Sequence, residues 1–352
     1  MKKLYTFLLS SSLAFGFVSD KEIANLFILG FYGTNANSNT QICKDLQKGL
    51  GGVILFQKSP VARNKAKNFT TALEAKQLIN QIKFCGKKPL VAVDQEGGLV
   101  QRVQFRGKYP KASVVVQRGK SYAKKVYSQM AQELASLGFN LNFAPVVDLA
   151  LNPKNKVIVR WGRSYGANVA DVVEYSTIFI DAMHKFKIAT TLKHFPGHGS
   201  SLGDTHKGFV DVTNLWQKVE LEPYFYLKNR SDAVMVAHIF NKNLDSNYPA
   251  SLSKRVVTNL LKRDIGFRGV VISDDLQMGA IAKHYSLKNR IKYSLNAGVD
   301  SMLFANQVHP RNTIKLSTLI HLTRELLNEG AVSEASIKAA NQRINTLKNR
   351  LY

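Results

Sequence analysis

The sequence is poor in cysteine and in acidic residues. Its 352 residues include only Cys43 and Cys85, which excludes a disulfide scaffold and a thiolate zinc site and allows at most one disulfide. Only 24 aspartates and glutamates stand against 49 lysines and arginines, and the net charge of +25 favours anionic partners. The basic residues are scattered and form no arginine-rich arm, so we expect no nucleic-acid binding.

Long hydrophobic runs are missing as well. Two lysines precede a mostly apolar stretch that ends at Val18, and this order is typical of a secretory signal peptide. No stretch reaches the roughly 18 uncharged apolar residues that a membrane span needs. We therefore expect residues 1–19 to be a signal peptide, cleaved between Gly16 and Asp20, and a periplasmic or secreted protein. The alternative is a buried N-terminal segment in a cytoplasmic protein.

No linker rich in proline, glycine or serine divides the rest of the chain. The hydrophobic fraction of 45% is large enough for a substantial core, so residues 20–352 are expected to form a single domain. Eight apolar or β-branched runs recur between longer amphipathic stretches. These runs are Phe27–Phe31, Gly52–Phe56, Leu90–Asp94, Leu141–Val147, Ala189–His194, Ala233–Ile239, Gly269–Asp274 and Ser301–Phe304.

Eight runs of this kind predict parallel strands, each followed by a helix. We therefore predict an α/β protein with a (β/α)8 TIM barrel. An open, doubly wound sheet would more often have five or six strands and a glycine-rich loop after the first one, which this chain lacks. Helical periodicity covers Ala72–Ile82, Tyr122–Leu137, Val169–Lys185, Leu276–Leu295 and Thr313–Leu327, and a C-terminal helical extension is expected over Glu334–Leu347.

Charged residues follow several of the predicted strands. Asp94, Lys193 with His194, His238 and Asp274 all stand at or just beyond the carboxyl end of an apolar run. In a barrel these ends meet at one rim, and a buried charge there is costly unless it is paired. The pattern predicts a functional site at that rim, and the alternative is a ring of structural ion pairs.

The segment Lys193–Gly199 contains two histidines, and Asp204 and His206 follow it closely. Three histidines within thirteen residues could bind zinc. The Pro-Gly and Gly-Ser turns between them, however, do not hold the regular helical pair of ligands that zinc sites use. We therefore expect no metal, and favour a loop that delivers a histidine as general acid/base, with Asp204 orienting its ring.

These motifs resemble those of the family 3 glycoside hydrolases, and in particular the bacterial β-N-acetylglucosaminidases that trim peptidoglycan fragments. The matching pieces stand in the family's order over residues 94–276. They are Asp94–Gly98, Gln101–Val103, Gly162–Gly166, Lys193–Gly199 with Asp204 and His206, and Ser273–Leu276. The sequence departs from the family at Leu99, where an arginine is usual, and at Tyr165, where a phenylalanine is usual. Neither departure removes a proposed catalytic group.

The resemblance implies a single (β/α)8 domain, without the sandwich domain that many relatives carry, and it implies roles for individual residues. Asp274 corresponds to the nucleophile, His206 to the general acid/base and Asp204 to its partner. Asp275 is expected to be structural, and His198 to shape its loop. The implied sugar-hydroxyl contacts are Asp94, Arg102, Arg163, Lys193 and His194.

The implied activity is that of a retaining exo-β-N-acetylglucosaminidase, which releases N-acetylglucosamine from muropeptides through a covalent glycosyl-enzyme. A carboxylate beneath the anomeric carbon stabilises and traps the developing oxocarbenium ion, while a protonated histidine serves the leaving group. The prediction includes no cofactor and a monomer.

Alternatives remain open within and outside this family. A β-glucosidase or β-xylosidase would keep Asp274. A phosphorylase is conceivable because a neutral imidazole repels phosphate less than a carboxylate would. The alternative of another class is a peptidoglycan-binding protein without catalysis.

Overall fold

A computed structural model of the chain describes residues 17–61, 65–205 and 208–352. It contains eight strands that alternate with helices along the chain. The strands are β1 Phe27–Leu29, β2 Gly52–Ile54, β3 Leu90–Val93, β4 Leu141–Asn142, β5 Ala189–Phe195, β6 Ala233–Val236, β7 Val270–Ser273 and β8 Met302–Phe304. Seven of the eight predicted apolar runs contain one of these strands, and β5 extends one residue beyond the eighth run.

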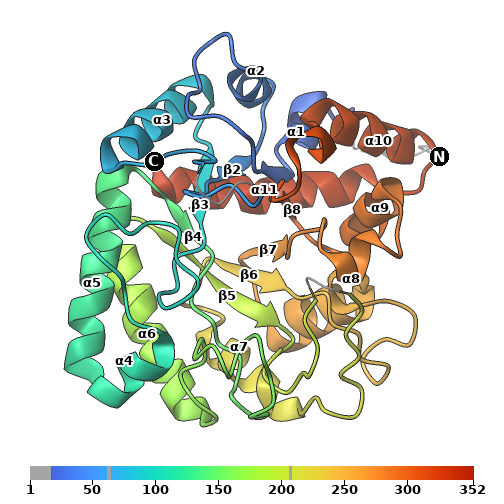
Figure 1. The fold of residues 1–352 in the computed structure, drawn as a ribbon. Coiled ribbons are helices and arrows are strands. Elements are labelled where there is room, and N and C mark those ends of the chain that lie inside the picture. The colour runs from blue at the N-terminus through green and yellow to red at the C-terminus, as the bar shows by residue number, and fades with distance from the viewer. Residues whose placement is uncertain (1–16, 62–64, 206–207) are drawn as a thin grey trace, which may run out of the picture.

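The strands form one parallel sheet in the order β7-β6-β5-β4-β3-β2-β1-β8. Its two ends meet, because Ile272 in β7 and Ser301 just before β8 form a parallel bridge, and Ser273 N donates to Ser301 O at 3.0 Å. The sheet therefore closes into a barrel with helices outside it, as Figure 1 shows. The predicted (β/α)8 barrel is confirmed.

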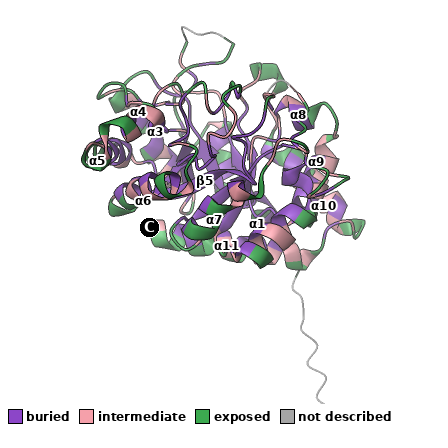
Figure 2. Ribbon diagram, turned by 90° about the horizontal axis from the view of Figure 1, so that it is seen from below, coloured by how far each residue is buried: buried purple, intermediate pink, exposed green. Residues whose placement is uncertain are grey.

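Every residue of the strands is buried. Parallel strands of this kind are covered on both faces and consist of valine, isoleucine, leucine and other apolar residues rather than of alternating polar ones. Figure 2 shows the consequence: buried residues fill the barrel and the inward faces of the helices, while exposed residues lie on the outer faces.

The helical layer consists of α-helices and a few short or irregular turns. The α-helices are α1 Asp20–Ala24, α2 Gln41–Gln47, α3 Ala72–Cys85, α4 Ala112–Arg118, α5 Lys120–Leu137, α6 Val169–Lys185, α7 Glu222–Leu227, α8 Gly279–Ala282, α9 Leu287–Ala297, α10 Leu316–Asn328 and α11 Glu334–Leu351. A π-helix, η3, spans Arg255–Ile265, and 3-10 turns cover Lys218–Leu221 (η1), Ala250–Leu252 (η2) and Pro310–Asn312 (η4). The predicted helices match α3, α5, α6 and α10 with small shifts at their ends, and the C-terminal extension is α11.

One predicted helix is wrong. The segment Leu276–Leu295, taken as continuous, contains two helices, α8 and α9. The Asp275 carboxylate accepts a hydrogen bond from Gln277 N at 3.0 Å and so stabilises a turn after β7. Farther on, Ser286 is extended, and its side chain caps the start of α9. The spacing of the apolar residues does not reveal either of these side-chain hydrogen bonds, so it predicts one continuous helix.

The last helix covers the amino ends of the strands. On α11, Arg343 pairs with Asp300 and Arg350 pairs with Asp232, both at 2.7 Å. Asp232 precedes β6 directly, and Asp300 lies shortly before β8. The side chain of Lys348 donates to Asn25 Oδ1 at 2.6 Å, close to the start of β1. The polar contacts of α11 therefore close the end of the barrel opposite the rim where the strands finish.

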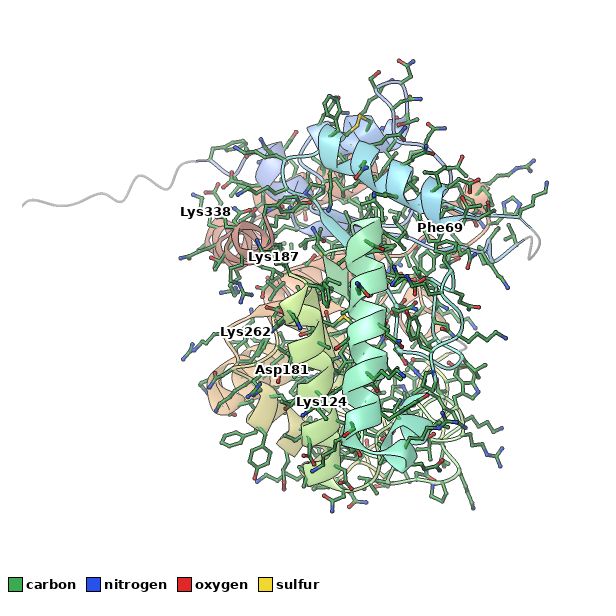
Figure 3. The ribbon with its side chains drawn as sticks, turned by 90° about the vertical axis from the view of Figure 1, so that its left-hand side faces the viewer. Phe69, Lys124, Asp181, Lys187, Lys262 and Lys338 are labelled. Carbon is green, nitrogen blue, oxygen red and sulfur yellow. A yellow bond between two sulfur atoms is a disulfide. The ribbon has the colours of Figure 1, made fainter. Side chains whose placement is uncertain are left out.

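The outer layer is stabilised by helix pairs and by one covalent bond. Figure 3 shows α5 and α6 side by side along the outside of the barrel, with Lys124 and Asp181 labelled on this flank. Above them, Cys43 in α2 and Cys85 at the end of α3 form a disulfide. The single bridge that the cysteine count allows is therefore present in this structure.

The chain enters the fold before α1. Val18 is fully buried, and the side chain of Ser19 caps α1 in a capping box with Glu22. Most of the predicted signal peptide, residues 1–16, lies outside the described residues. In the described ranges, no helix combines the length and the apolar character needed to cross a bilayer.

Candidate active site

A cavity of about 560 Å³ opens where the carboxyl ends of the strands meet. Its size lies within the range of small-molecule sites. Among the residues that line it are Asp94, Arg102, Arg163, Lys193, His194, Asp204 and Asp274. The structure thus brings seven of the eight predicted site residues to one cavity. The eighth, His206, lies outside the described residues and follows Thr205, which also lines the cavity.

A buried carboxylate that we did not assign from the sequence organises the floor of this cavity. Glu96 accepts two hydrogen bonds from Arg163, both at 2.8 Å, and pairs with Lys193 Nζ at 2.7 Å. Burial alone would raise the pKa of Glu96, but Arg163 and Lys193 outweigh it and hold the pKa well below its usual range. Glu96 in turn raises the pKa of Arg163 against the opposing effect of burial. Glu96 and Arg163 therefore stay charged.

A second carboxylate, Asp148, orients the histidines. Its Oδ2 lies 2.7 Å from His194 Nδ1, and its Oδ1 accepts the backbone N–H groups of His194 and His198 at 3.1 and 2.8 Å. Burial would raise the pKa of Asp148, but its histidine neighbours lower it. The ionised carboxylate favours the tautomer of His194 that carries its proton on Nδ1, and so leaves Nε2 as the acceptor that faces Arg163 at 3.3 Å.

His198 has the structural role expected for it. Its Nδ1 lies 2.6 Å from Ser201 Oγ within the same loop. Burial lowers the pKa of His198 to about 4, so its ring is neutral near neutral pH. The contact with Ser201 agrees with the prediction that His198 shapes its loop, and His198 also lines the cavity.

An irregularity in β5 turns two consecutive side chains toward the cavity. The pairing of β5 with β6 shifts register between Leu192 and Phe195. In a regular strand, neighbouring side chains point to opposite faces, whereas an irregularity can redirect one of them. Lys193 and His194 both line the cavity and are both buried. Lys193 also reaches Asp94 Oδ1 at 3.1 Å, which links the ends of β5 and β3.

Asp274 follows β7 directly, and its backbone N–H donates to Val236 O at 3.0 Å at the end of β6. Its Oδ1 accepts the N–H of Asp275 at 2.8 Å. Asp275 Oδ1 accepts the N–H groups of Gln277 and Ala305 at 3.0 and 3.2 Å, which ties the ends of β7 and β8 together. Asp275 thus has the structural role predicted for it, and Asp274 is held at the cavity wall.

Two further cations lie near the same end of the barrel. Lys67 is buried, and its ammonium donates to the carbonyls of Ala305 and Asn306 at 2.9 and 2.8 Å. Burial lowers the pKa of Lys67 to about 7, while Asp275 acts in the opposite direction. Arg102 is more exposed. Its guanidinium lies 4.0 Å from Asp94 and stacks 5.6 Å from the centre of the Phe56 ring.

His238, which the strand-end pattern also singled out, does not line the cavity. It is buried, with Nδ1 2.7 Å from Ser251 Oγ and Nε2 2.9 Å from the carbonyl of Asp275. These contacts are hydrogen bonds to a hydroxyl and a carbonyl, so they give His238 neither a place in the predicted site nor one in the alternative, a ring of structural ion pairs.

Neither Glu96 nor Asp148 was among the site residues predicted from the sequence. Both could have been found: Asp148 follows the predicted strand Leu141–Val147 directly, and Glu96 stands two residues after Asp94. Among the described residues, no group of three or more histidine, cysteine, aspartate or glutamate side chains is arranged to hold a metal ion.

A model of the glycosyl hydrolase family 3 N-terminal domain matches residues 18–347 of the chain. A β-hexosaminidase of Haemophilus influenzae is 34% identical over 272 residues, which cover 73% of this chain and 73% of that protein. A β-hexosaminidase of Actinobacillus succinogenes is also 34% identical, over 314 residues that cover 85% of this chain and 83% of the relative.

Solved structures show the same fold. A family 3 β-N-acetylglucosaminidase from Paenibacillus sp. superposes with a TM-score of 0.85 and 28% identity, and the match covers 95% of this chain and 63% of the other. The chain thus spans less than two thirds of that protein. A glycosyl hydrolase of the same family from Mycobacterium smegmatis superposes with a TM-score of 0.80 at 25% identity, over 94% of this chain and 97% of the other.

Proposed function

The chain belongs to glycosyl hydrolase family 3 and is a glycoside hydrolase of the β-N-acetylhexosaminidase type, and from this premise we propose that it releases terminal N-acetylglucosamine from peptidoglycan fragments with retention of configuration. One observation carries the proposal. Asp274 stands at the end of β7, in the wall of a cavity whose other charged residues come from the ends of β3, β5 and β7 and from the loops after β3, β4 and β5.

The charged floor of the cavity suits the ring of a single sugar. Asp94, Lys193, Arg163 and His194 offer charged donors and acceptors to hydroxyl groups, and charge-assisted hydrogen bonds are stronger than neutral ones. Glu96 and Asp148 hold these side chains in place from behind. A sugar that is held at this depth, with its anomeric carbon toward Asp274, would extend its leaving group toward the opening of the cavity.

In the proposed first step, Asp274 attacks the anomeric carbon and forms a glycosyl-enzyme while the leaving group takes a proton from His206. In the second step, His206 takes a proton from water, which then displaces Asp274. Asp204, two residues before His206 in the sequence and part of the cavity lining, would orient the imidazole and favour its protonated form. Two displacements retain the configuration at the anomeric carbon.

We propose an oxidising compartment for this activity. The N-terminal sequence has the order of an export signal, and a disulfide such as Cys43–Cys85 persists outside the reducing cytoplasm. Because Val18 is buried and Ser19 caps α1, the cleavage that best preserves the fold lies before Val18, within the predicted window.

The test compares the hydrolysis of 4-nitrophenyl N-acetyl-β-glucosaminide and 4-nitrophenyl β-glucoside by the wild type, Asp274→Ala and His206→Ala. We expect the wild type to prefer the aminosugar and to release the β-anomer first, as followed by proton NMR. Asp274→Ala should be almost inactive. His206→Ala should lose roughly 10²–10⁴-fold in kcat/KM, and less on substrates with good leaving groups that need no proton.

Matched controls come from exposed residues of the same types. Asp264→Ala in η3 and His321→Ala on α10 alter side chains that are 51% and 72% exposed and should retain full activity. A fully active Asp274→Ala would overturn the assignment of the nucleophile. Preference for the glucoside would favour a β-glucosidase, a sugar 1-phosphate formed in phosphate buffer would favour a phosphorylase, and binding without turnover would favour a non-catalytic protein.

A further inference from the structure

A second cavity, of about 590 Å³, lies at the end of the barrel opposite the active site. Residues that stand shortly before β1, β2 and β3 line it, together with residues of α1, α2 and α11. Its volume is within the range of small-molecule sites. It shares no lining residue with the active-site cavity, so a ligand bound here does not compete with a sugar bound there.

The lining of this second cavity is rich in positive charge. Four lysines contribute to it, namely Lys21, Lys87, Lys88 and Lys348. Among the described residues, Glu22 is the one acidic residue in the lining. Its carboxylate belongs to the capping box of α1 and accepts hydrogen bonds from the backbone N–H and the hydroxyl of Ser19 at 2.8 and 2.7 Å. The cavity therefore favours an anionic ligand.

Lys348 is the most deeply buried of the four lysines, at 6% exposure. An ammonium group has three N–H donors, and that of Lys348 donates to Asn25 Oδ1 at 2.6 Å. Burial lowers the pKa of Lys348, and no carboxylate in the described part of the chain opposes this effect. A buried charge is costly unless it is paired, and an anion in the cavity would supply the counter-charge.

Asparagine side chains hold two of the ammonium groups in place. Asn25, which accepts the hydrogen bond of Lys348, donates from Nδ2 to Asn341 Oδ1 at 2.7 Å. Lys88, which precedes β3, donates from Nζ to Asn349 Oδ1 at 3.0 Å. Both acceptor asparagines and Lys348 belong to α11. This helix therefore positions cations from two distant parts of the chain at one cavity.

The type of cation indicates the type of anion. Arginine is favoured where a planar carboxylate is bound through two parallel hydrogen bonds, whereas lysine acts as a point charge and is a common ligand of phosphate. The described lining contains four lysines and no arginine. We propose that this cavity binds a phosphate group, with Lys348 and Lys88 as its main counter-charges.

The cavity is larger than a phosphate group, so it has room for the organic part of a phosphate ester. Such a group belongs either to a soluble phosphate ester or to a phospholipid headgroup, and the tests below distinguish these two sources. The inference goes beyond the proposed function and does not depend on it, because the two cavities lie at opposite ends of the barrel.

The first test is isothermal titration calorimetry of the wild type at pH 7 and about 0.15 M NaCl, which screens weak surface contacts. Glycerol 3-phosphate is the probe. Glycerol lacks its charge, and malonate carries a similar charge on planar carboxylates. We expect glycerol 3-phosphate to bind at one site, and glycerol and malonate to bind at least about tenfold more weakly.

Three variants locate the binding site. Lys348→Met and Lys88→Gln alter the lining, whereas Lys338→Met removes a charge elsewhere on α11, at the position labelled in Figure 3. We expect Kd for glycerol 3-phosphate to rise about tenfold in Lys348→Met, about two- to fivefold in Lys88→Gln, and not at all in Lys338→Met. Hydrolysis of the nitrophenyl aminosugar should be unchanged in all three variants, which also shows that they fold.

The second test identifies the source of the phosphate. Sedimentation with phosphatidylglycerol vesicles is compared with sedimentation with phosphatidylcholine vesicles. Because the whole protein is basic, only a difference between Lys348→Met and Lys338→Met is counted. Binding to phosphatidylglycerol that is lost in Lys348→Met alone would identify a lipid headgroup. Equal sedimentation of the two variants, with the expected calorimetric difference between them, would identify a soluble ester.

The phosphate site would be overturned if the wild type bound neither glycerol 3-phosphate nor phosphatidylglycerol vesicles. Equal affinity for malonate and glycerol 3-phosphate would overturn the choice of phosphate over carboxylate. Equal losses of binding in Lys348→Met and Lys338→Met would show that the net charge of the protein, and not this cavity, attracts the anion. None of these results bears on hydrolysis, so the proposed function is decided by its own test.

Discussion

Glu96 accepts hydrogen bonds from Arg163 and lies 2.7 Å from Lys193 at the floor of the cavity, and all three side chains are buried. Removing two cations and a carboxylate from water costs several kcal/mol for each ion. The attraction between Glu96 and the two cations offsets much of this cost, whereas a single buried charge would have no such compensation. Glu96 does not line the cavity itself. Its contacts nevertheless fix the positions of Lys193 and Arg163, which are proposed to bind the substrate.

We expect Glu96→Gln to lower the free energy of unfolding by about 3–5 kcal/mol, because it leaves two buried cations without their shared counter-charge. Urea denaturation would measure the change, and KM for the nitrophenyl aminosugar should rise in parallel. Glu174→Gln is the matched control. Glu174 is 44% exposed and pairs with Lys120 at the surface, and a pair of this kind contributes at most about 1 kcal/mol. Equal effects of the two variants would contradict the role given to Glu96.

The residue types of the site could be predicted from the sequence, and their connections could not. Asp94 and Asp274 follow apolar runs, so their place at the rim follows from the topology of a barrel. The hydrogen bonds of Glu96 and Asp148 join residues 67 and 46 positions apart. No local pattern of spacing shows which carboxylate meets which cation over such separations.

At the scale of elements, α11 closes the end of the barrel where the amino ends of the strands lie. Its polar residues contact groups that stand just before strands, among them Asp232 and Asp300. Lys348 is the most deeply placed of these cations, with Asn25 Oδ1 as the acceptor at 2.6 Å. Burial lowers the pKa of Lys348 to about 7. A charged Lys348 therefore opposes the docking of the helix, while a neutral one does not.

The stability of the protein should accordingly rise with pH through Lys348. Below pH 7 the amine is charged in both the folded and the unfolded state, so the penalty of burying it is fully present. Above pH 7 the folded state releases the proton, while the unfolded state keeps it up to a pKa of about 10.4. The free energy of unfolding should then rise by at most about 1.4 kcal/mol per pH unit.

Lys348→Met removes the pH dependence that comes from Lys348. The pKa of Lys67 is also lowered, but its effect on stability is the same in the wild type and in the variant. We expect Lys348→Met to be more stable than the wild type at pH 6, and its advantage to shrink from pH 7 to pH 9 in urea denaturation. The control is Lys338→Met, on the same helix at a partly exposed position. This variant keeps Lys348, so its stability should rise with pH in parallel with that of the wild type. Parallel stability curves for wild type and Lys348→Met would contradict the argument.

The elements themselves were predictable where one physical signal dominates. The strands follow from apolar runs that are buried on both faces, and α6 from an uninterrupted helical period with Asn168 as its cap. The late start of the first helix, α8, depends on a side-chain hydrogen bond of Asp275, and the start of α9 depends on one of Ser286. Both act against a periodic pattern that favours one continuous helix.

At the scale of the whole molecule, the two ends of the barrel have separate tasks. The carboxyl ends of the strands carry the cavity with its charged floor, and the amino ends carry the ion pairs of α11. The helical layer between them is joined covalently at one place, where Cys43 and Cys85 link α2 to α3. Neither cysteine lines the active-site cavity, so loss of this bond should change stability and leave the chemistry of the cavity intact.

We therefore expect Cys43→Ser/Cys85→Ser to unfold at lower urea concentration, with kcat and KM for the nitrophenyl aminosugar unchanged. A bridge between positions that are 42 residues apart limits the unfolded chain, and the loop-entropy model assigns it about 4 kcal/mol of stability. Wild type treated with dithiothreitol is the control and should unfold as the variant does.

The proposed compartment predicts that enzyme isolated from the periplasm or medium without reductant carries no thiol that reacts with a maleimide. Two reactive thiols in that material, or identical unfolding of oxidised wild type and the double variant, would show that the bond does not stabilise the exported protein.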